Sequence, residues 1–252
     1  MQPLGQTRTT IKPNHAFIAP DGYVKSILPG WTQSQGIILI SPHMLKRPRF
    51  TQYLALMARD AIAGQPYQGI QRFVYVMEGA IIIEIAGDTY VLEAGHFAYI
   101  PADTNHRMIA SVESQLLIFE KPYHKSDLIS DFPHFVTGDS WAGDGVPFMG
   151  DEDARVRTLL PDTLPFDMAV NLFTFQSGAA LPFVETHIME HGFYLLEGQG
   201  IYRLDDSWYP IQAGDVLWMG SYCPQWFCAF GKTQSTYIYY KDINRDPLSG
   251  LG

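Results

Sequence analysis

The chain has 252 residues, with 17 lysines and arginines against 26 aspartates and glutamates, which gives a formal net charge of −9 at pH 7. This acidic balance excludes non-specific binding to nucleic acid, because a phosphate backbone demands a basic surface. Hydrophobic residues make up 46% of the chain and charged residues 17%. Such a composition allows a sizeable core and excludes an intrinsically disordered chain.

The N-terminal end of the sequence carries no apolar stretch of the kind found in secretory signals. No apolar run reaches the roughly 18 residues that a membrane-spanning helix requires. Cys223 and Cys228 are too few for a disulfide framework and lack the CxxC spacing of zinc sites. We therefore expect a cytoplasmic protein with reduced thiols and with no membrane or nucleic-acid partner.

Short segments rich in β-branched and aromatic residues follow one another along the chain and are separated by glycine-containing turns; clear examples are 73–77, 80–85 and 115–119. Many short strands with regular turns predict an all-β sandwich or barrel. Helical periodicity is weak throughout. We expect only two short helices, around 125–129 and 151–159.

The two halves of the sequence resemble each other. The strand that ends at Gly79 matches the strand that ends at Gly198, at an offset of 119 residues. Gly95 and Gly214, each preceded by Ala, lie at the same offset, and the strands near the end of each half agree with it to within one residue. A constant offset over several strands and turns indicates a tandem duplication.

The duplication predicts where the domain boundaries fall. Between the two repeats lies a stretch rich in Asp, Gly and Pro, which is typical of a linker. We predict a first domain at 1–123, a linker at 124–150 and a second domain at 151–252.

Potential metal ligands gather in the second half. Glu185, His187 and His191 lie at i, i+2 and i+6, and on an extended strand all three side chains would point to one face. Two imidazoles and a carboxylate suit a divalent ion such as Mn, Fe, Co, Ni or Zn. Gln225 follows 34 residues after His191.

This spacing resembles the two cupin motifs, G-x5-H-x-H-x3,4-E-x6-G and G-x5-P-x-G-x2-H-x3-N. The first fits from Glu185 to Gly198 with Glu and His exchanged at the outer ligand positions, and the second fits from Gly214 to Gln225 with Gln in place of His. The resemblance implies a tandem cupin, or bicupin, made of two jelly-roll β-barrels. It also implies one metal site in the second half, on Glu185, His187, His191 and Gln225.

The first half keeps the second motif, from Gly95 through Pro101 to His106, but has lost the first. The residues at the matching ligand positions are Pro66, Gln68 and Arg72. Pro has no donor side chain and Arg stays protonated, so neither can bind a metal. We therefore predict one metal per chain and interpret His106 as a structural residue.

The permuted ligand set resembles one cupin family closely, that of (S)-ureidoglycine aminohydrolase, called glyoxylate-induced protein in some bacteria. The segments that carry the resemblance are 20–30, 185–200, 217–225 and 237–246. Family membership would imply a homo-oligomeric, Mn2+-dependent hydrolase of purine (allantoin) breakdown. The reaction releases ammonia from (S)-ureidoglycine, a small-molecule substrate, and forms (S)-ureidoglycolate.

The same resemblance implies roles for further residues. Tyr202, Tyr237 and Lys241 match the positions that contact substrate in the family, and Glu185 would contact it as well. As a point charge, Lys241 suits a carboxylate, and we count it with Glu185 as catalytic. Our hypothesis for Glu185 is a second role as the general acid and base. Without the resemblance, the tyrosines would be interpreted as core residues and Lys241 as a surface residue.

Two other classes of function stay open from the residues alone. Two His and one carboxylate also form the site of Fe(II) dioxygenases, and other cupins are isomerases, both acting on small carboxylates. A fourth ligand such as Gln225 counts against an open triad. The remaining class is a non-catalytic bicupin that binds a small molecule.

Overall fold

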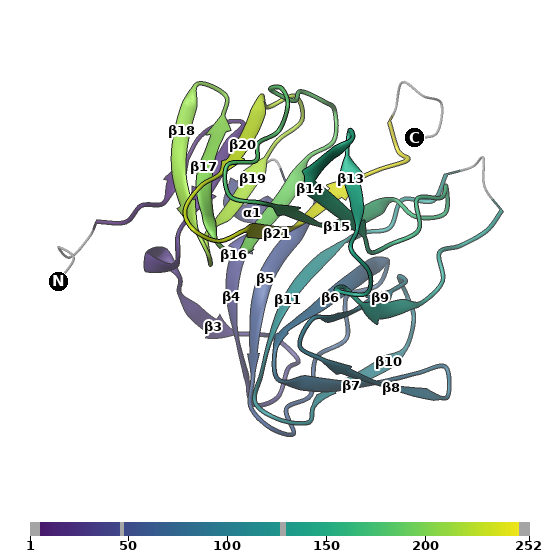
Figure 1. Cartoon of the computed structure of the whole chain (residues 1–252). Helices are drawn as coiled ribbons and strands as arrows, with labels where there is room; N and C mark the ends of the chain where they lie inside the picture. Colours follow the sequence, from purple (N-terminus) through teal and green to yellow (C-terminus); the bar gives the residue numbers. More distant parts are fainter. Residues whose placement is uncertain (1–5, 46–47, 127–129, 247–252) are drawn as a thin grey trace. The chain divides into compact units, whose positions relative to one another are not determined.

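The computed structural model describes residues 6–45, 48–126 and 130–246 of the chain. Almost all of its regular structure is β (Figure 1), which confirms the predicted fold class. The two helices in the described part are single turns, η1 (Pro20–Gly22) and α1 (Pro42–Leu45). Neither of these described helices approaches the length or hydropathy that a membrane crossing needs.

The chain folds into two compact units, which we call the first unit (Val24–Ala142) and the second unit (Met1–Tyr23 with Gly143–Gly252). The first unit holds a seven-stranded sheet in the order β12-β9-β6-β11-β5-β4-β3 and a three-stranded sheet in the order β10-β7-β8. Apolar side chains of both sheets form one core. Its strands are β3 (Lys25–Ile27), β4 (Ser34–Ile40), β5 (Thr51–Met57), β6 (Ile70–Glu78), β7 (Ala80–Ile85), β8 (Asp88–Glu93), β9 (His96–Ile100), β10 (His106–Ala110), β11 (Ser114–Pro122) and β12 (Val136–Asp139).

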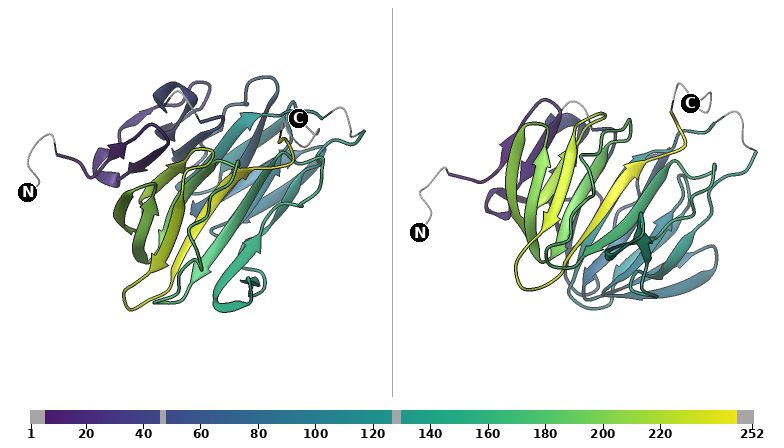
Figure 2. Two further views of the ribbon diagram at one scale, coloured as in Figure 1. Left: turned by 90° about the horizontal axis from the view of Figure 1, so that it is seen from above. Right: turned by 45° about the horizontal axis from the view of Figure 1, so that its top comes forward.

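The second unit repeats this architecture, with an eight-stranded sheet in the order β1-β2-β19-β16-β21-β15-β14-β13 and a three-stranded sheet in the order β18-β17-β20. Figure 2 shows β21, in yellow, between green strands of the larger sheet. Its strands are β1 (Thr10–Ile11), β2 (His15–Ile18), β13 (Val146–Phe148), β14 (Asp151–Thr158), β15 (Met168–Phe175), β16 (His191–Glu197), β17 (Gln199–Leu204), β18 (Ser207–Gln212), β19 (Val216–Met219), β20 (Gln225–Ala229) and β21 (Ser235–Asp242).

Two glycines mark the duplication at the level of the backbone. Gly79 and Gly198 end equivalent strands with φ angles of 80° and 82°, a region that side chains with a Cβ rarely adopt. A Cβ atom on either would also collide with a backbone carbonyl oxygen, that of Glu113 or of Gln234. The predicted repeat is therefore confirmed in both topology and local conformation, and the fold is the predicted tandem cupin with two jelly rolls.

The compact units differ from the predicted boundaries. The described part of Met1–Tyr23 belongs to the second unit, although it lies at the start of the predicted first domain. The predicted linker 124–150 contains strands of both units, β12 and β13. Pairing of these strands is a long-range property, so composition along the chain did not reveal it.

The helix expected at 151–159 is a strand. β14 pairs with β15 through five consecutive residues, and its side chains alternate, with Ala154 and Val156 packed against the core. β15 is buried along its whole length, so a neighbouring strand satisfies its backbone groups where a helix would not. Of the other expected helix, residues 127–129 lie outside the described part of the chain, and 125–126 are not helical.

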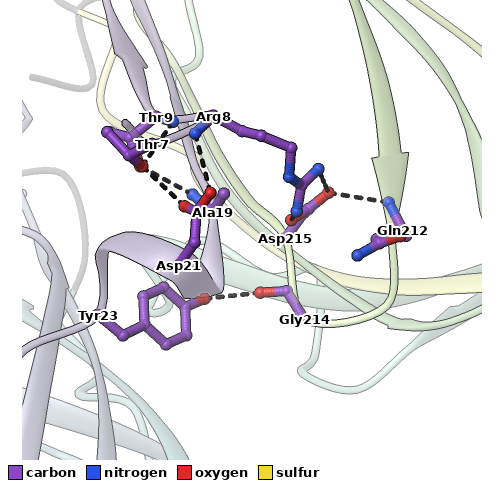
Figure 3. A network of polar contacts seen from close by, with 9 residues as sticks. All are labelled: Thr7, Arg8, Thr9, Ala19, Asp21, Tyr23, Gln212, Gly214 and Asp215. Atoms are coloured by element: carbon purple, nitrogen blue, oxygen red, sulfur yellow. Dashed lines mark hydrogen bonds and ion pairs between the residues drawn. The ribbon is translucent and has the colours of Figure 1, made fainter. Parts of the chain in front are cut away.

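The N-terminal arm, residues 6–23, is fastened to the second unit. All four residues of β2 are buried, and β2 pairs with β19. Arg8 forms two hydrogen bonds to the fully buried Asp215, at 3.0 and 2.7 Å, and the Tyr23 hydroxyl donates to the Gly214 carbonyl (Figure 3). The arm thus completes the larger sheet of that unit.

Candidate functional site

A cavity of about 200 Å3 lies within the second unit, between strands of its two sheets and the loop that precedes β16. Every residue that the sequence predicted for the site lines this cavity: Glu185, His187, His191, Tyr202, Gln225, Tyr237 and Lys241. Its remaining lining residues are Phe148, Phe173, Met189, Phe193, Met219 and Tyr239. The predicted set therefore shares one enclosure.

Strand β21 supplies one wall of the cavity. Tyr237, Tyr239 and Lys241 line it, because alternate side chains of a strand point to the same face. Directly across from Lys241, on β16, lies His191. The antiparallel register therefore places a predicted metal ligand beside the only lysine of the cavity lining.

The two histidines have defined tautomers. The Nδ1 atom of His187 lies 3.0 Å from the carbonyl oxygen of Met189, and the Nδ1 atom of His191 lies 3.2 Å from that of Tyr240. A carbonyl oxygen only accepts hydrogen bonds, so each Nδ1 carries the proton. Burial lowers the pKa of His187, and it lowers that of His191 to about 3. Both rings are therefore neutral at pH 7 and present a bare Nε2 lone pair.

These lone pairs face each other. The two Nε2 atoms are 3.1 Å apart, and without a proton between them two lone pairs at this distance repel. Two ligands on adjacent positions of one metal ion also lie roughly 3 Å apart, given metal–nitrogen bonds of about 2.1 Å. The histidine pair therefore fits a divalent cation, which would bind both lone pairs.

Gln225 completes this group from β20. The Nε2 atom of its side-chain amide lies 2.8 Å from Nε2 of His187 and donates to that lone pair, and its Oε1 atom accepts a hydrogen bond from the Tyr202 hydroxyl at 3.3 Å. Two backbone hydrogen bonds between Gln225 and Glu185, at 2.8 and 2.9 Å, anchor the loop to β20. In the described residues no three His, Cys, Asp or Glu side chains stand together as a metal cluster. The polar group nearest to the two imidazoles is this amide. Glu185 lines the same cavity.

The remaining polar residues differ in charge. Burial raises the pKa of Glu185, and the positive charge of Lys241 opposes that shift. Burial also raises the pKa of Tyr239 to about 12 and that of Tyr202 and Tyr237 well above the usual value. The tyrosines are therefore hydroxyl donors at neutral pH, and Glu185 holds a proton more readily than an exposed glutamate does.

One premise of the sequence argument was wrong. Glu185, His187 and His191 were expected to share the face of a continuous strand, but β16 begins only at His191. Residues 186–190 form an irregular loop, and Glu185 makes an isolated bridge to Gln225. The two histidine rings thus meet although the segment before β16 is not a strand.

Sequence reasoning missed six residues of the cavity lining, among them Tyr239 and Phe148. Tyr239 lies between Tyr237 and Lys241 on one face of β21, so the two-residue period of a strand would have found it. Phe148 comes from β13, inside the predicted linker, and packs on Phe173 with ring centroids 5.0 Å apart. No local signal marks Phe148, because its place depends on the pairing of β13 with β14.

The first unit carries a different group at the equivalent place. Arg72, at the position of His191, is 2% exposed and donates through Nε to Glu120 at 2.6 Å. Its Nη1 also donates to the Gly64 carbonyl at 2.9 Å and lies 3.4 Å from Nε2 of His106. His106 thus faces a permanent cation, which agrees with its interpretation as a structural residue.

Known proteins share both the sequence and the fold. A family model described as "Cupin domain" matches residues 63–119. A rice protein named "Probable (S)-ureidoglycine aminohydrolase" is 41% identical over 97% of this chain and 78% of its own length. An Arabidopsis thaliana protein named "(S)-ureidoglycine aminohydrolase" is 39% identical over 97% of this chain and 80% of its own.

This chain belongs to the (S)-ureidoglycine aminohydrolase family. Its relatives are hydrolases by name, so the chain is an enzyme and a hydrolase. The crystal structure of protein Ylba from Escherichia coli superposes with a TM-score of 0.83 and 32% identity, and covers 95% of this chain and 96% of that one. The family resemblance seen in the sequence is therefore confirmed over nearly the whole chain.

A more distant neighbour shares the fold alone. Oxalate decarboxylase from Bacillus subtilis superposes with a TM-score of 0.69 at 12% identity, covering 96% of this chain and 79% of that one. That protein has Mn(II) centres. The donor set of this chain, two imidazoles with an amide and a carboxylate in one cavity, itself suits a divalent ion.

Proposed function

We propose that the second unit releases ammonia from (S)-ureidoglycine and forms (S)-ureidoglycolate, with Mn2+ held by Glu185, His187, His191 and Gln225. The observation that carries this proposal is the pair of neutral imidazoles whose lone pairs meet at 3.1 Å in a cavity that Lys241 also lines. The names of relatives that are up to 41% identical support the substrate.

The chemistry divides between the ion and the side chains. A bound divalent ion supplies a Lewis acid that polarises the substrate and fixes which face reacts. Lys241 binds the substrate carboxylate as a point charge. The hydroxyl groups of Tyr202 and Tyr237 donate hydrogen bonds to substrate oxygens. The aromatic walls of the cavity exclude bulk water, which strengthens each of these interactions.

Glu185 is the proposed proton carrier. In the reaction a C–N bond breaks and ammonia leaves, while the oxygen of water bonds to the same carbon. The leaving nitrogen must gain a proton and the incoming water must lose one, so one carboxyl group can serve both steps. The raised pKa of Glu185 brings it closer to neutral pH, where one carboxyl group can both donate and accept a proton.

A coupled assay tests the function. Allantoate amidohydrolase would generate (S)-ureidoglycine in the presence of Mn2+, and chirally resolved ureidoglycolate would be followed together with ammonia and oxygen uptake. We expect faster ammonia release, a single (S) product and no oxygen uptake, with activity lost on chelation and in His187→Ala. Racemic product at the background rate would refute the proposed substrate, and oxygen consumption would favour a dioxygenase.

A carboxylate exchange tests the role of Glu185. We expect Glu185→Gln to lower kcat about 100-fold or more, because an amide cannot carry the proton, while the protein still binds metal through its remaining ligands. Glu152→Gln is the control, since Glu152 is exposed on β14 of the same unit. Turnover that survives in Glu185→Gln with metal bound would contradict the assignment.

The wider setting is proposed from family membership. We place the reaction in allantoin and purine breakdown in the cytoplasm, and we expect the chain to form a homo-oligomer. Sedimentation of the purified protein tests the oligomeric state, and a monomer at micromolar concentration would contradict it.

A further inference from the structure

The loop at residues 186–190, which we call the ligand loop, carries His187 and leads into β16 at His191. Backbone atoms fasten it at two places. Just before the loop, the residue at position 185 exchanges two backbone hydrogen bonds with Gln225 on β20. Within the loop, the His187 carbonyl oxygen accepts a hydrogen bond from the backbone N–H of Tyr222 at 2.7 Å. Both fastenings use main-chain groups, so they do not depend on a particular side chain.

A third fastening depends on one side chain, that of Asp242. The backbone N–H of Glu190, the last residue of the ligand loop, donates to Oδ1 of Asp242 at 2.7 Å. Asp242 is the last residue of β21 and follows Lys241 directly. A short hydrogen bond to a carboxylate is stronger than one between neutral groups. The Asp242 carboxylate therefore ties the end of the ligand loop to the strand that carries the lysine of the cavity.

The first unit shows which contact this bond replaces. There β6 and β11 stay paired for two further residues beyond Arg72. In the second unit the ladder between β16 and β21 ends at the equivalent residue, His191. The register of that ladder would make Glu190 and Asp242 the next pair, and it is the Asp242 side chain that takes up the N–H there. The ligand loop thus lies outside the ladder while its last N–H keeps a partner on β21.

Glu190 is held from both sides of β16. It is 2% exposed, and burial makes an unpartnered N–H or carboxylate costly. Its Oε2 atom accepts a hydrogen bond from Nε1 of Trp218 on β19 at 3.2 Å, while Asp242 on β21 takes its N–H. Strands β19 and β21 are the two neighbours of β16 in the sheet. The residue next to His191 is therefore fixed by both of them.

The placing of the two histidines depends on this end of the ligand loop. Glu190 lies three residues after His187 and directly before His191, whose Nε2 atoms are 3.1 Å apart. A binding site keeps its affinity when its donors are held in place before the ligand arrives. Without the bond to Asp242 the ligand loop would gain conformational freedom that metal binding must then remove.

We infer that Asp242 is a positioning residue for the metal site: through the Glu190 N–H it holds the ligand loop in the conformation that binds the ion. This inference rests on the proposed function and deepens it. Asp242 is not a residue of the cavity lining, so its role is to support the ligands. An acceptor oxygen at this position is what the role requires, and the negative charge is not.

Titration of the chelator-treated full chain with Mn2+ tests this role, with the free ion followed by electron paramagnetic resonance. We expect Asp242→Ala to weaken Mn2+ binding about tenfold, as loss of a group that supports metal ligands does. Asp242→Asn keeps an acceptor oxygen at the same place and should stay within about threefold of wild type. Asp242→Ser, whose hydroxyl is one atom too short, should resemble Asp242→Ala and replaces it if the alanine variant does not fold.

Asp151→Ala is the matched control. Asp151 is an exposed residue of the same unit and also accepts a backbone hydrogen bond, from the N–H of Asp153 at 2.9 Å, but it is not part of the cavity lining. Its loss should leave the Mn2+ affinity unchanged. Urea unfolding of each metal-free variant measures separately what these bonds contribute to stability.

Mn2+ affinity decides this inference and turnover decides the proposed substrate, so the two fail in different ways. Weak binding in Asp242→Ala with near-normal binding in Asp242→Asn supports the inference, whether or not ureidoglycine is turned over. Unchanged affinity in Asp242→Ala overturns it. A loss in Asp242→Asn as large as in Asp242→Ala also overturns it, because the charge would then be what matters. A wild-type chain that binds no Mn2+ refutes both the proposed site and this inference.

Discussion

At the scale of single residues, buried histidines in this protein are fixed as neutral tautomers by their hydrogen-bond partners. His15 shows the same principle outside the cavity. The Asn14 amide donates to Asp205 at 3.0 Å, which turns its oxygen toward Nδ1 of His15 at 2.9 Å. The Tyr209 hydroxyl then donates to Nε2, also at 2.9 Å. Every polar atom of this group is satisfied when His15 is uncharged.

This arrangement makes stability depend on pH. Burial lowers the pKa of His15, although Asp205 opposes the shift. Between the folded pKa and the unfolded value near 6.5, the unfolded chain binds a proton that the folded chain does not. The free energy of unfolding therefore falls as pH falls through that window, by at most about 1.4 kcal/mol per pH unit for one group.

We expect His15→Gln to reduce this pH dependence. Urea unfolding of EDTA-treated wild type and variant at pH 7.5 and 5.5 measures it. Wild type should lose more stability than the variant over this range, by no more than about 1.4 kcal/mol, the limit for one group over the pH unit below 6.5. Parallel losses in the two proteins would show that His15 contributes nothing to the dependence.

At the scale of elements, the N-terminal arm matters because it adds β1 and β2 to the sheet that holds the site. β2 pairs with β19, and Met219 at the end of β19 lines the cavity. The Arg8 side chain is 37% exposed, but its partner Asp215 is completely buried. Loss of Arg8 would leave that carboxylate buried, with the backbone N–H of Gln212 as its remaining hydrogen-bond donor among the described residues.

We expect Arg8→Ala to lower the free energy of unfolding by roughly 2 kcal/mol, because an uncompensated buried charge is strongly destabilising. Arg107→Ala is the control. Arg107 forms an ion pair with Glu84 at 3.5 Å in which both side chains are about half exposed, and such pairs contribute about 0 to 1 kcal/mol. Equal losses in urea unfolding would refute a special role for the arm.

At the scale of the whole molecule, two copies of one fold have diverged in charge. In the second unit His191 on β16 pairs with Lys241 on β21, and in the first unit Arg72 on β6 pairs with Glu120 on β11. The cation of the first unit is thus a buried side chain paired with a partly buried carboxylate. The second unit instead presents two unprotonated imidazole nitrogens.

This divergence predicts the metal content. We expect about one divalent ion per chain after loading and dialysis, none in His187→Ala, and an unchanged content in His106→Ala. Atomic emission analysis of the three proteins measures it, with thermal melting to show that each variant is folded. Two ions per chain, or loss of metal in His106→Ala, would contradict the assignment of the site to the second unit.

The sequence by itself determined the fold class and the duplication, and it predicted a set of site residues that line one cavity. Constant spacing between glycines such as Gly79 and Gly198 was enough, because these backbone conformations tolerate little else. The ligand spacing predicted His187, His191 and Gln225 as metal ligands, since residue type limits what can bind a metal, and all three line one cavity. All these signals are local in the chain or repeat at a fixed distance along it.

Tertiary structure decided what depends on pairing between distant strands. It joined the N-terminal arm to the second unit, made 151–158 a strand, and brought Phe148 into the cavity. It also replaced the expected strand before His191 with a loop. The physical reason is that backbone hydrogen bonds and side-chain burial in a sheet are satisfied by partners far away in sequence, which no local pattern specifies.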